Sequence, residues 1–243
     1  DKGMLPSELK NEFSETGLAH ILAISGLHVG FIVLLLSFLQ KIFKLPPKAA
    51  FAVQTLLLSF YCFVIGAPAS AVRATIMAMI VLGGRLLGRE PDSINSMALS
   101  ALIILLFRPL DLFDLGFQLS FAAVGGIFLY SDIIKKLFKF LPDSLSNSVS
   151  VTLSAQIGTW PLIAYHFNII SPLALIANLL MVPVAGIIVI LGFIMLIVSA
   201  ILPWLGSFLG YIIEYISLLL IKGNSLIASI PWSSLKIISP SVI

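Results

Sequence analysis

Residues 172–202 read PLALIANLLMVPVAGIIVILGFIMLIVSAIL, a run without a single charged side chain. A transmembrane α-helix needs about 20 predominantly apolar residues, so this run is long enough to cross a bilayer and too long for one straight span. It contains Pro183, which has no backbone N–H to donate. We therefore expect a break at Pro183, with a short or re-entrant piece over 172–182 and a span over 184–202.

The composition of the whole chain agrees with a membrane environment. Of its 243 residues, 59% are hydrophobic and 10% are charged, and the mean hydropathy is +1.12. Soluble domains are about 25% charged, so this chain has too few charges to cover a water-facing surface. A soluble globular domain is excluded. The single cysteine, Cys62, also excludes an internal disulfide framework and a cysteine zinc site.

Seven further apolar segments accompany this run. They are 18–39, 49–65, 69–88, 94–107, 115–130, 149–166 and 204–222. None shows the alternation of a membrane β-barrel strand, and in lipid the backbone groups of a span must be satisfied internally, as in a helix. We predict an all-α polytopic membrane protein with about seven or eight transmembrane or re-entrant helices, broken near Pro68 and Pro183.

The charge pattern predicts an orientation for this core, which we place at 18–222 between a polar lead-in (1–17) and an interfacial or re-entrant tail (223–243). The loops 40–48, 84–93 and 131–147 are rich in lysine and arginine and lie on one side if the segments cross in turn. Because cytoplasmic loops carry an excess of Lys and Arg, we expect a multi-pass protein of the cell membrane with its N-terminus outside. The basic, amphipathic stretch 131–140 is expected on the cytoplasmic membrane face.

Polar side chains inside apolar segments are the candidates for function, because a central arginine alone costs about 2.5–3.5 kcal/mol on insertion scales. They are His20, Ser25, His28, Gln54, Arg73, Gln118, Gln156, His166, Asn178 and Glu214. Each has two interpretations: it faces a polar pathway, or it makes a hydrogen bond between packed helices.

Four clusters concentrate these residues. In the first, Ser25 and His28 are three residues apart and would be neighbours on a helix, while Gly26 and Gly30 permit another helix to approach. In the second, Pro68 resembles a helix start. Arg73 follows it, either extending to the outer interface or contacting an anion at a pore mouth.

In the third cluster, Gln118 and Ser120 supply intramembrane hydrogen-bonding groups, and Gly125 and Gly126 permit tight packing. In the fourth cluster, Asn178 lies between Pro161 and Pro183, two prolines that each leave a backbone carbonyl free. The asparagine is therefore placed to satisfy one of these carbonyls.

Several enzyme signatures are absent. The chain has no P-loop pattern and no HExxH, so we expect no cofactor, no metal and no catalytic residue. Ser25 with nearby histidines raises an intramembrane serine hydrolase as one alternative, although His28 lies on the serine's own segment. A small-solute transporter or a scaffold is the other alternative.

The runs HILAISGLHVG (20–30), PASAVRA (68–74), RPLDLFDLGFQLSFAAVGGI (108–127), WPL (160–162) and FNIISPLALIANLLMVP (167–183) resemble the membrane core of the ComEC-type competence proteins. These are inner-membrane channels of bacterial natural transformation. The resemblance covers about residues 17–190. The positions that match the family's motifs are His20, Ser25, Gly26, His28, Gly30, Pro68, Arg73, Gln118, Ser120 and Asn178.

The resemblance implies a channel that carries single-stranded DNA from outside into the cytosol. It further implies an extracytoplasmic DNA receptor and a cytosolic ATPase as partners, together with flanking OB-like and metallo-β-lactamase-like domains. The HxHxDH signature of the latter domain is missing here, so no nuclease activity is expected. By this resemblance the chain corresponds to an excised core or a truncated family member.

Overall fold

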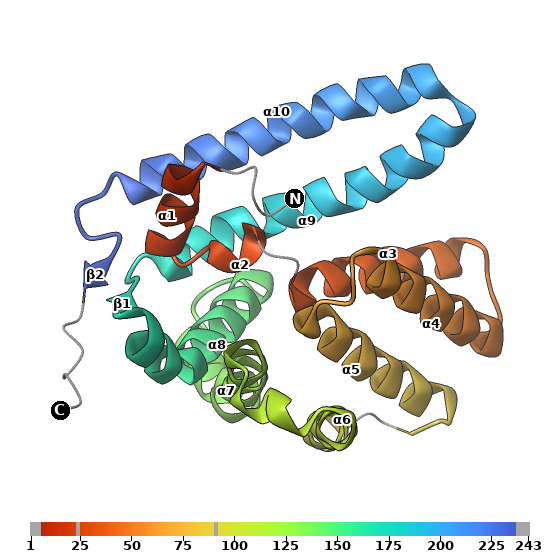
Figure 1. Ribbon diagram of the computed structural model, residues 1–243, viewed down its shortest axis with the longest axis horizontal. Helices are drawn as coiled ribbons and strands as arrows, with labels where there is room; N and C mark the ends of the chain where they lie inside the picture. Colours follow the sequence, from red (N-terminus) through yellow and green to blue (C-terminus); the bar gives the residue numbers. More distant parts are fainter. Residues whose placement is uncertain (1–5, 23–24, 90–91, 237–243) are drawn as a thin grey trace.

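The computed structural model describes residues 6–22, 25–89 and 92–236, which are almost entirely helical (Figure 1). The α-helices in these ranges are α1 (Ser7–Glu15), α2 (Ala19–Leu22), α3 (Gly26–Ile42), α4 (Pro47–Val64), α5 (Ala69–Leu86), α6 (Ser93–Phe107), α7 (Leu115–Leu137), α8 (Asp143–Phe167), α9 (Ala174–Ile201) and α10 (Pro203–Ala228). A 3₁₀ helix, η1 (Pro109–Phe113), precedes α7. Two short strands, β1 (Ile169–Ile170) and β2 (Leu235–Lys236), pair antiparallel. The predicted all-α class is confirmed.

Five of the described helices are long and apolar enough to cross a membrane, namely α4, α5, α7, α9 and α10. Two more, α3 and the apolar part of α6 (Ile94–Phe107), are shorter. The chain is therefore a polytopic helical membrane protein, as its composition predicts. Helix α8 is long but less apolar, since its first half is rich in serine.

The predicted break at Pro183 is wrong. Helix α9 runs without interruption from Ala174 to Ile201, with Pro183 inside it. A proline within a helix removes one hydrogen bond, here the one to the Leu179 carbonyl, and packing against neighbouring helices makes this tolerable in membrane helices. That packing is present, because Met181 and Ala185 are buried in a core shared with α1, α2 and α10. The break near Pro68 is present, because Pro68 caps α5 after α4 has ended at Val64.

Several predicted boundaries also differ. Segment 18–39 forms two helices, α2 and α3, and residues 23–24 between them lie outside the described residues. Helix α7 continues to Leu137, so most of stretch 131–140 extends a candidate span. Helix α10 continues to Ala228, so the predicted tail boundary at 222 lies within a helix.

Contacts between helix termini show which ends of α3, α4, α5 and α7 lie together. At one end, Gly26 of α3 packs beside Ala74 of α5, and Arg73 of α5 contacts Asp114 before α7. At the other end, Gln40 at the end of α3 donates to the Ala50 carbonyl of α4 at 2.9 Å. The starts of α3, α5 and α7 therefore share one end of the molecule, and we call it the first end.

The most extensive helix contacts are between α7 and α8 and between α9 and α10. Figure 1 shows α9 and α10 as a long hairpin, with α1 beside the final turns of α10 and α3, α4 and α5 grouped together. A second buried core joins α3, α4 and α5 through Val29, Leu58 and Ala71. The candidate site lies where this three-helix group meets α6 and α7.

Candidate functional site

Arg73 is the most unusual buried side chain of the molecule. It lies in the second turn of α5, and only 2% of it is exposed. Helix α5 starts there because Pro68, in extended conformation, provides the N-cap, and its carbonyl accepts the N–H groups of Ala71 and Val72. A guanidinium is almost never fully buried unless it is paired, so its partner identifies the site.

The partner of Arg73 is Asp114, 41 residues further along the chain. Its Oδ1 lies 3.5 Å from Arg73 Nη1, and the Asp114 side chain is 48% exposed. The same oxygen accepts the Phe117 N–H at 2.8 Å, which makes Asp114 the N-cap of α7. The Phe117 ring adds a cation–π contact, with its centroid 5.9 Å from the guanidinium.

A cleft opens beside this ion pair. It has a volume of about 360 Å³ and lies between the first turns of α5, the end of α6 and η1. Arg73, Arg108 and Asp111 supply its charged wall, and Ala69 and Phe107 contribute to the apolar wall. The volume is within the range of about 300–1,000 Å³ typical of small-molecule sites, so the cleft can hold one small polar group with an apolar neighbour.

Gln118 stabilises the place where α5, η1 and α7 meet, which we call the junction. Its Nε2 donates to the Leu112 carbonyl at 3.1 Å, which ties η1 to the first turn of α7. Ser120 lies two residues further along α7 and is half-buried. The structure therefore brings together the second and third predicted clusters, with Pro68, Arg73 and Gln118 around one junction.

The first cluster lies next to this junction. Ser25 is the N-cap of α3, and its backbone N–H and its Oγ lie 3.3 and 3.2 Å from Nδ1 of His28. His28 Nδ1 therefore accepts, and the proton belongs on Nε2. The expected helical neighbours do meet, as a capping interaction and not within a helix. The contact has a structural role, because it satisfies the Ser25 backbone N–H at the helix start.

The glycines of this cluster differ in their surroundings. A Cβ at Gly26 would lie 3.2 Å from the Ala74 side chain, one residue from Arg73, whereas a Cβ at Gly30 would meet nothing within 4 Å. The predicted close approach is present at Gly26 alone. His20 is in the separate helix α2.

Asn178 lies apart from the junction. It is on α9, next to Ala177, which packs against Phe13 and Leu18. Its Oδ1 is buried and has no hydrogen-bond partner among the described residues. Asn178 is therefore not among the residues that line the cleft at Arg73.

Three residues of the site are not among those predicted from the sequence: Arg108, Asp111 and Asp114. All three lie in the run RPLDLFDLGF, and an aspartate directly before an apolar helix is a recognisable N-cap signal. That signal would have found Asp114 and the start of α7. It would not have shown that Asp114 faces Arg73, because the pairing depends on how α5 and α7 pack.

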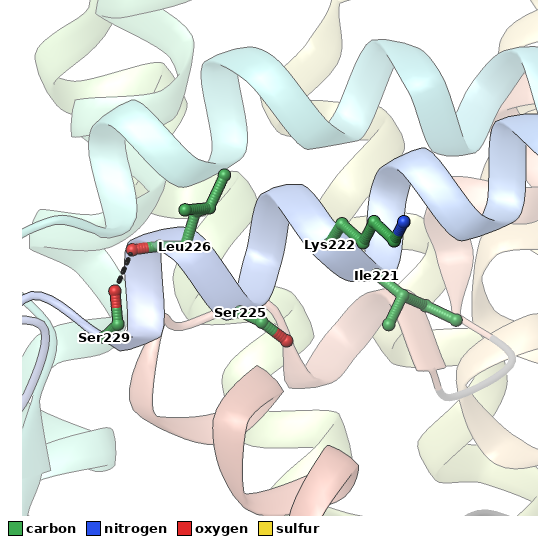
Figure 2. A pocket seen from close by; sticks show the side chains of 5 residues that line it. All are labelled: Ile221, Lys222, Ser225, Leu226 and Ser229. Atoms are coloured by element: carbon green, nitrogen blue, oxygen red, sulfur yellow. Dashed lines mark hydrogen bonds between the residues drawn. The ribbon is translucent and has the colours of Figure 1, made fainter.

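A second hollow, on α10, contains no motif residue (Figure 2). It has a volume of about 440 Å³ and is lined by Ile221, Lys222, Ser225, Leu226 and Ser229 of that one helix. Ser229 donates to the Leu226 carbonyl at 2.8 Å, and Ser225 donates to Glu12 of α1 at 2.5 Å. The hydroxyls lining this hollow therefore hold α10 to itself and to α1.

Comparison with known proteins gives the family. A sequence profile described as "Competence protein" matches residues 1–243. The chain is 35% identical over 183 residues to ComE operon protein 3 of Bacillus subtilis (strain 168), which is 75% of this chain and 23% of that protein. It is 32% identical over 184 residues to an uncharacterized protein of Aquifex aeolicus (strain VF5), covering 75% of this chain and 41% of that one.

A third relative is uncharacterized protein YcaI of Escherichia coli (strain K12), 31% identical over 191 residues, 74% of this chain and 25% of that protein. The chain thus spans less than half the length of each of these relatives. No solved structure matches it. The profile match over the whole chain, together with the identity to ComE operon protein 3, shows that this chain belongs to the competence protein family.

Proposed function

We propose that this chain is the membrane core of a DNA-uptake system and conducts a single DNA strand across the cell membrane into the cytoplasm. Membership of the competence family and the similarity to ComE operon protein 3 support a role in DNA uptake. The observation that carries the conduit is Arg73, a buried cation beside a cleft in a helix apolar enough to span a membrane. A buried charge within a membrane helix is costly and marks substrate paths.

The distribution of charge supports a direction. The lysine- and arginine-rich loops follow the ends of α3, α5 and α7, whereas the Arg73 cleft lies at their starts. With the basic loops in the cytoplasm, the first end and the N-terminus face outward. The strand then meets the cleft first and the cytoplasmic loops last.

The cleft contains the kinds of side chain that bind a single DNA strand. Proteins that hold single strands without sequence preference combine cations for phosphates with aromatic surfaces for bases. Arg73 and Arg108 supply cations, and Phe107 supplies an aromatic ring. In line with the resemblance to the ComEC-type proteins, the proposal includes a cytosolic ATPase that supplies the force and an extracytoplasmic receptor that delivers the DNA.

The test exploits the two arginines of α5. Arg73→Gln removes the buried cation, and we expect uptake of labelled DNA to fall by about tenfold or more, equivalent to about 1.4 kcal/mol. Arg85→Gln, which changes an exposed arginine at the opposite end of the same helix, should retain uptake. Protein level in the membrane is measured for both. Undiminished uptake in Arg73→Gln at normal level would refute a pathway at Arg73.

A further inference from the structure

We propose that Asp114 holds the place of a DNA phosphate at Arg73, and that a phosphate of the passing strand replaces Asp114 as the partner of the guanidinium. The inference rests on the proposed function, since it assigns a ligand to the same cleft. It concerns the chemistry of binding, which is measurable without transport.

The geometry of the Arg73–Asp114 pair allows the two side chains to separate. Charge-assisted hydrogen bonds between an arginine and a carboxylate are typically about 2.7–2.9 Å long, and this one is 3.5 Å. Asp114 Oδ1 has a closer partner in the Phe117 N–H at 2.8 Å. Asp114 therefore keeps its capping role when Arg73 leaves it, and α7 retains its first turn.

Arg73 has capacity for a second partner. Its Nε is buried and has no hydrogen-bond partner among the described residues, and the side chain lines the cleft. A guanidinium offers five donors in a planar fork that matches two phosphate oxygens. A buried charge without any counter-charge is strongly unfavourable. Exchange of one anion for another avoids that state, because Arg73 is neutralised both before and after the strand arrives.

The other charges of the site make binding weak. Arg73 pairs with Asp114 and lines the cleft together with Arg108 and Asp111, so two positive groups balance two negative ones. In this neutral site the carboxylates compete with each phosphate for the arginines. A phosphate is therefore bound but not retained, as a conduit requires. Removing the Asp114 carboxylate leaves a net positive charge and leaves Arg73 without its ion-pair partner, so the strand should then bind more tightly.

The experiment measures binding of a fluorescent oligothymidylate to the full chain in vesicles of zwitterionic lipid. Asp114→Asn keeps an N-cap of equal quality and removes the charge. We expect its Kd to fall about three- to tenfold, by roughly 0.7–1.4 kcal/mol. Asp92→Asn is the matched control, since Asp92 caps α6 in the same way, accepting from the N–H groups of Ile94 and Asn95. Its Kd should not change.

Two further variants complete the design. Arg73→Gln combined with Asp114→Asn should lose the gain, because the recipient of the phosphate is gone. If Asp114→Asn lowers the thermal midpoint, Asp111→Asn replaces it, since Asp111 lines the cleft and does not cap α7; a smaller gain is expected.

An unchanged or higher Kd in a stably folded Asp114→Asn or Asp111→Asn protein would overturn the exchange. So would a gain in binding of phosphatidylglycerol with oligothymidylate binding unchanged, which would assign the cleft to a lipid headgroup. The two proposals fail separately. Tighter oligothymidylate binding with normal uptake in Arg73→Gln would retain the phosphate site and refute the conduit. Loss of uptake in Arg73→Gln without a Kd change in Asp114→Asn would retain the conduit and refute the phosphate exchange.

Discussion

Two helix pairs of this molecule use their polar and small residues in opposite ways. In α8, which packs on α7, the hydroxyls of Ser150, Ser154 and Thr159 donate to carbonyls of their own helix at 2.6–2.9 Å. At the junction of α5 and α7, Arg73 reaches a carboxylate outside its own helix. The first arrangement is complete within one element, whereas the second exists only when two elements meet.

The difference shows which intramembrane polar residues point to function. A serine that bonds three or four residues back satisfies itself at little cost and indicates only a packed surface. A charge whose partner comes from another helix depends on the assembled fold and opens when that fold or its ligand changes. By this criterion Arg73 is a functional candidate, and the serines of α8 are packing residues.

The largest expected effect is at the crossing of α7 and α8. A Cβ at Gly126 would overlap the Ser154 carbonyl and lie 3.0 Å from Gly158 Cα, whereas a Cβ at Gly125 would meet nothing within 4 Å. We expect Gly126→Ala to destabilise the protein by about 1–3 kcal/mol and to lower Tm by several degrees, at about 2–4 °C per kcal/mol. Gly125→Ala is the matched control and should leave Tm unchanged in detergent melts. Equal behaviour of the two variants would disprove the close crossing.

A much smaller effect is expected at Ser154. Its hydroxyl is fully buried and donates to the Ser150 carbonyl at 2.6 Å. Ser154→Ala removes donor and hydroxyl together and leaves a carbonyl that belongs to the helix. We expect a change within about 0.5 kcal/mol in the same melts, with DNA uptake retained. Loss of uptake without loss of stability would show that this serine does more than pack, and the contrast with Arg73 would fail.

The fold class followed from the sequence because hydropathy acts over whole segments. The positions at which the helices begin, end or continue did not follow from the sequence. Proline at 183 signals a break locally, and the buried packing of Met181 and Ala185 overrides it. Helix α3 begins at Gly26 with Ser25 as its N-cap, inside an apolar segment where hydropathy gives no sign of a helix start. Ser25 and His28 are three residues apart, a spacing that suits a capping box as well as two neighbours on a helix. The sequence therefore indicated that the two side chains meet, but not that they meet as a helix cap.

The candidate site was predictable in part for a similar reason. Arg73 and Gln118 stand out because polar groups in apolar segments are rare. Asp114 does not stand out, since it lies in a loop with other charges. Its role depends on a contact 41 residues distant in the chain. Asn178 is equally polar and lies elsewhere, which shows that polarity alone does not assign a residue to the site.

The most direct test asks whether a strand in transit touches the cleft. A photo-crosslinking residue is placed at Ala69, which lines the cleft beside Arg73, and in a second variant at Leu226, which is 71% exposed in the hollow of α10. DNA with a bulky block at its trailing end is allowed to stall during uptake and is then irradiated. If the strand passes the cleft, a covalent DNA adduct forms at position 69 and none forms at 226. Adducts at 226 with none at 69 would contradict it.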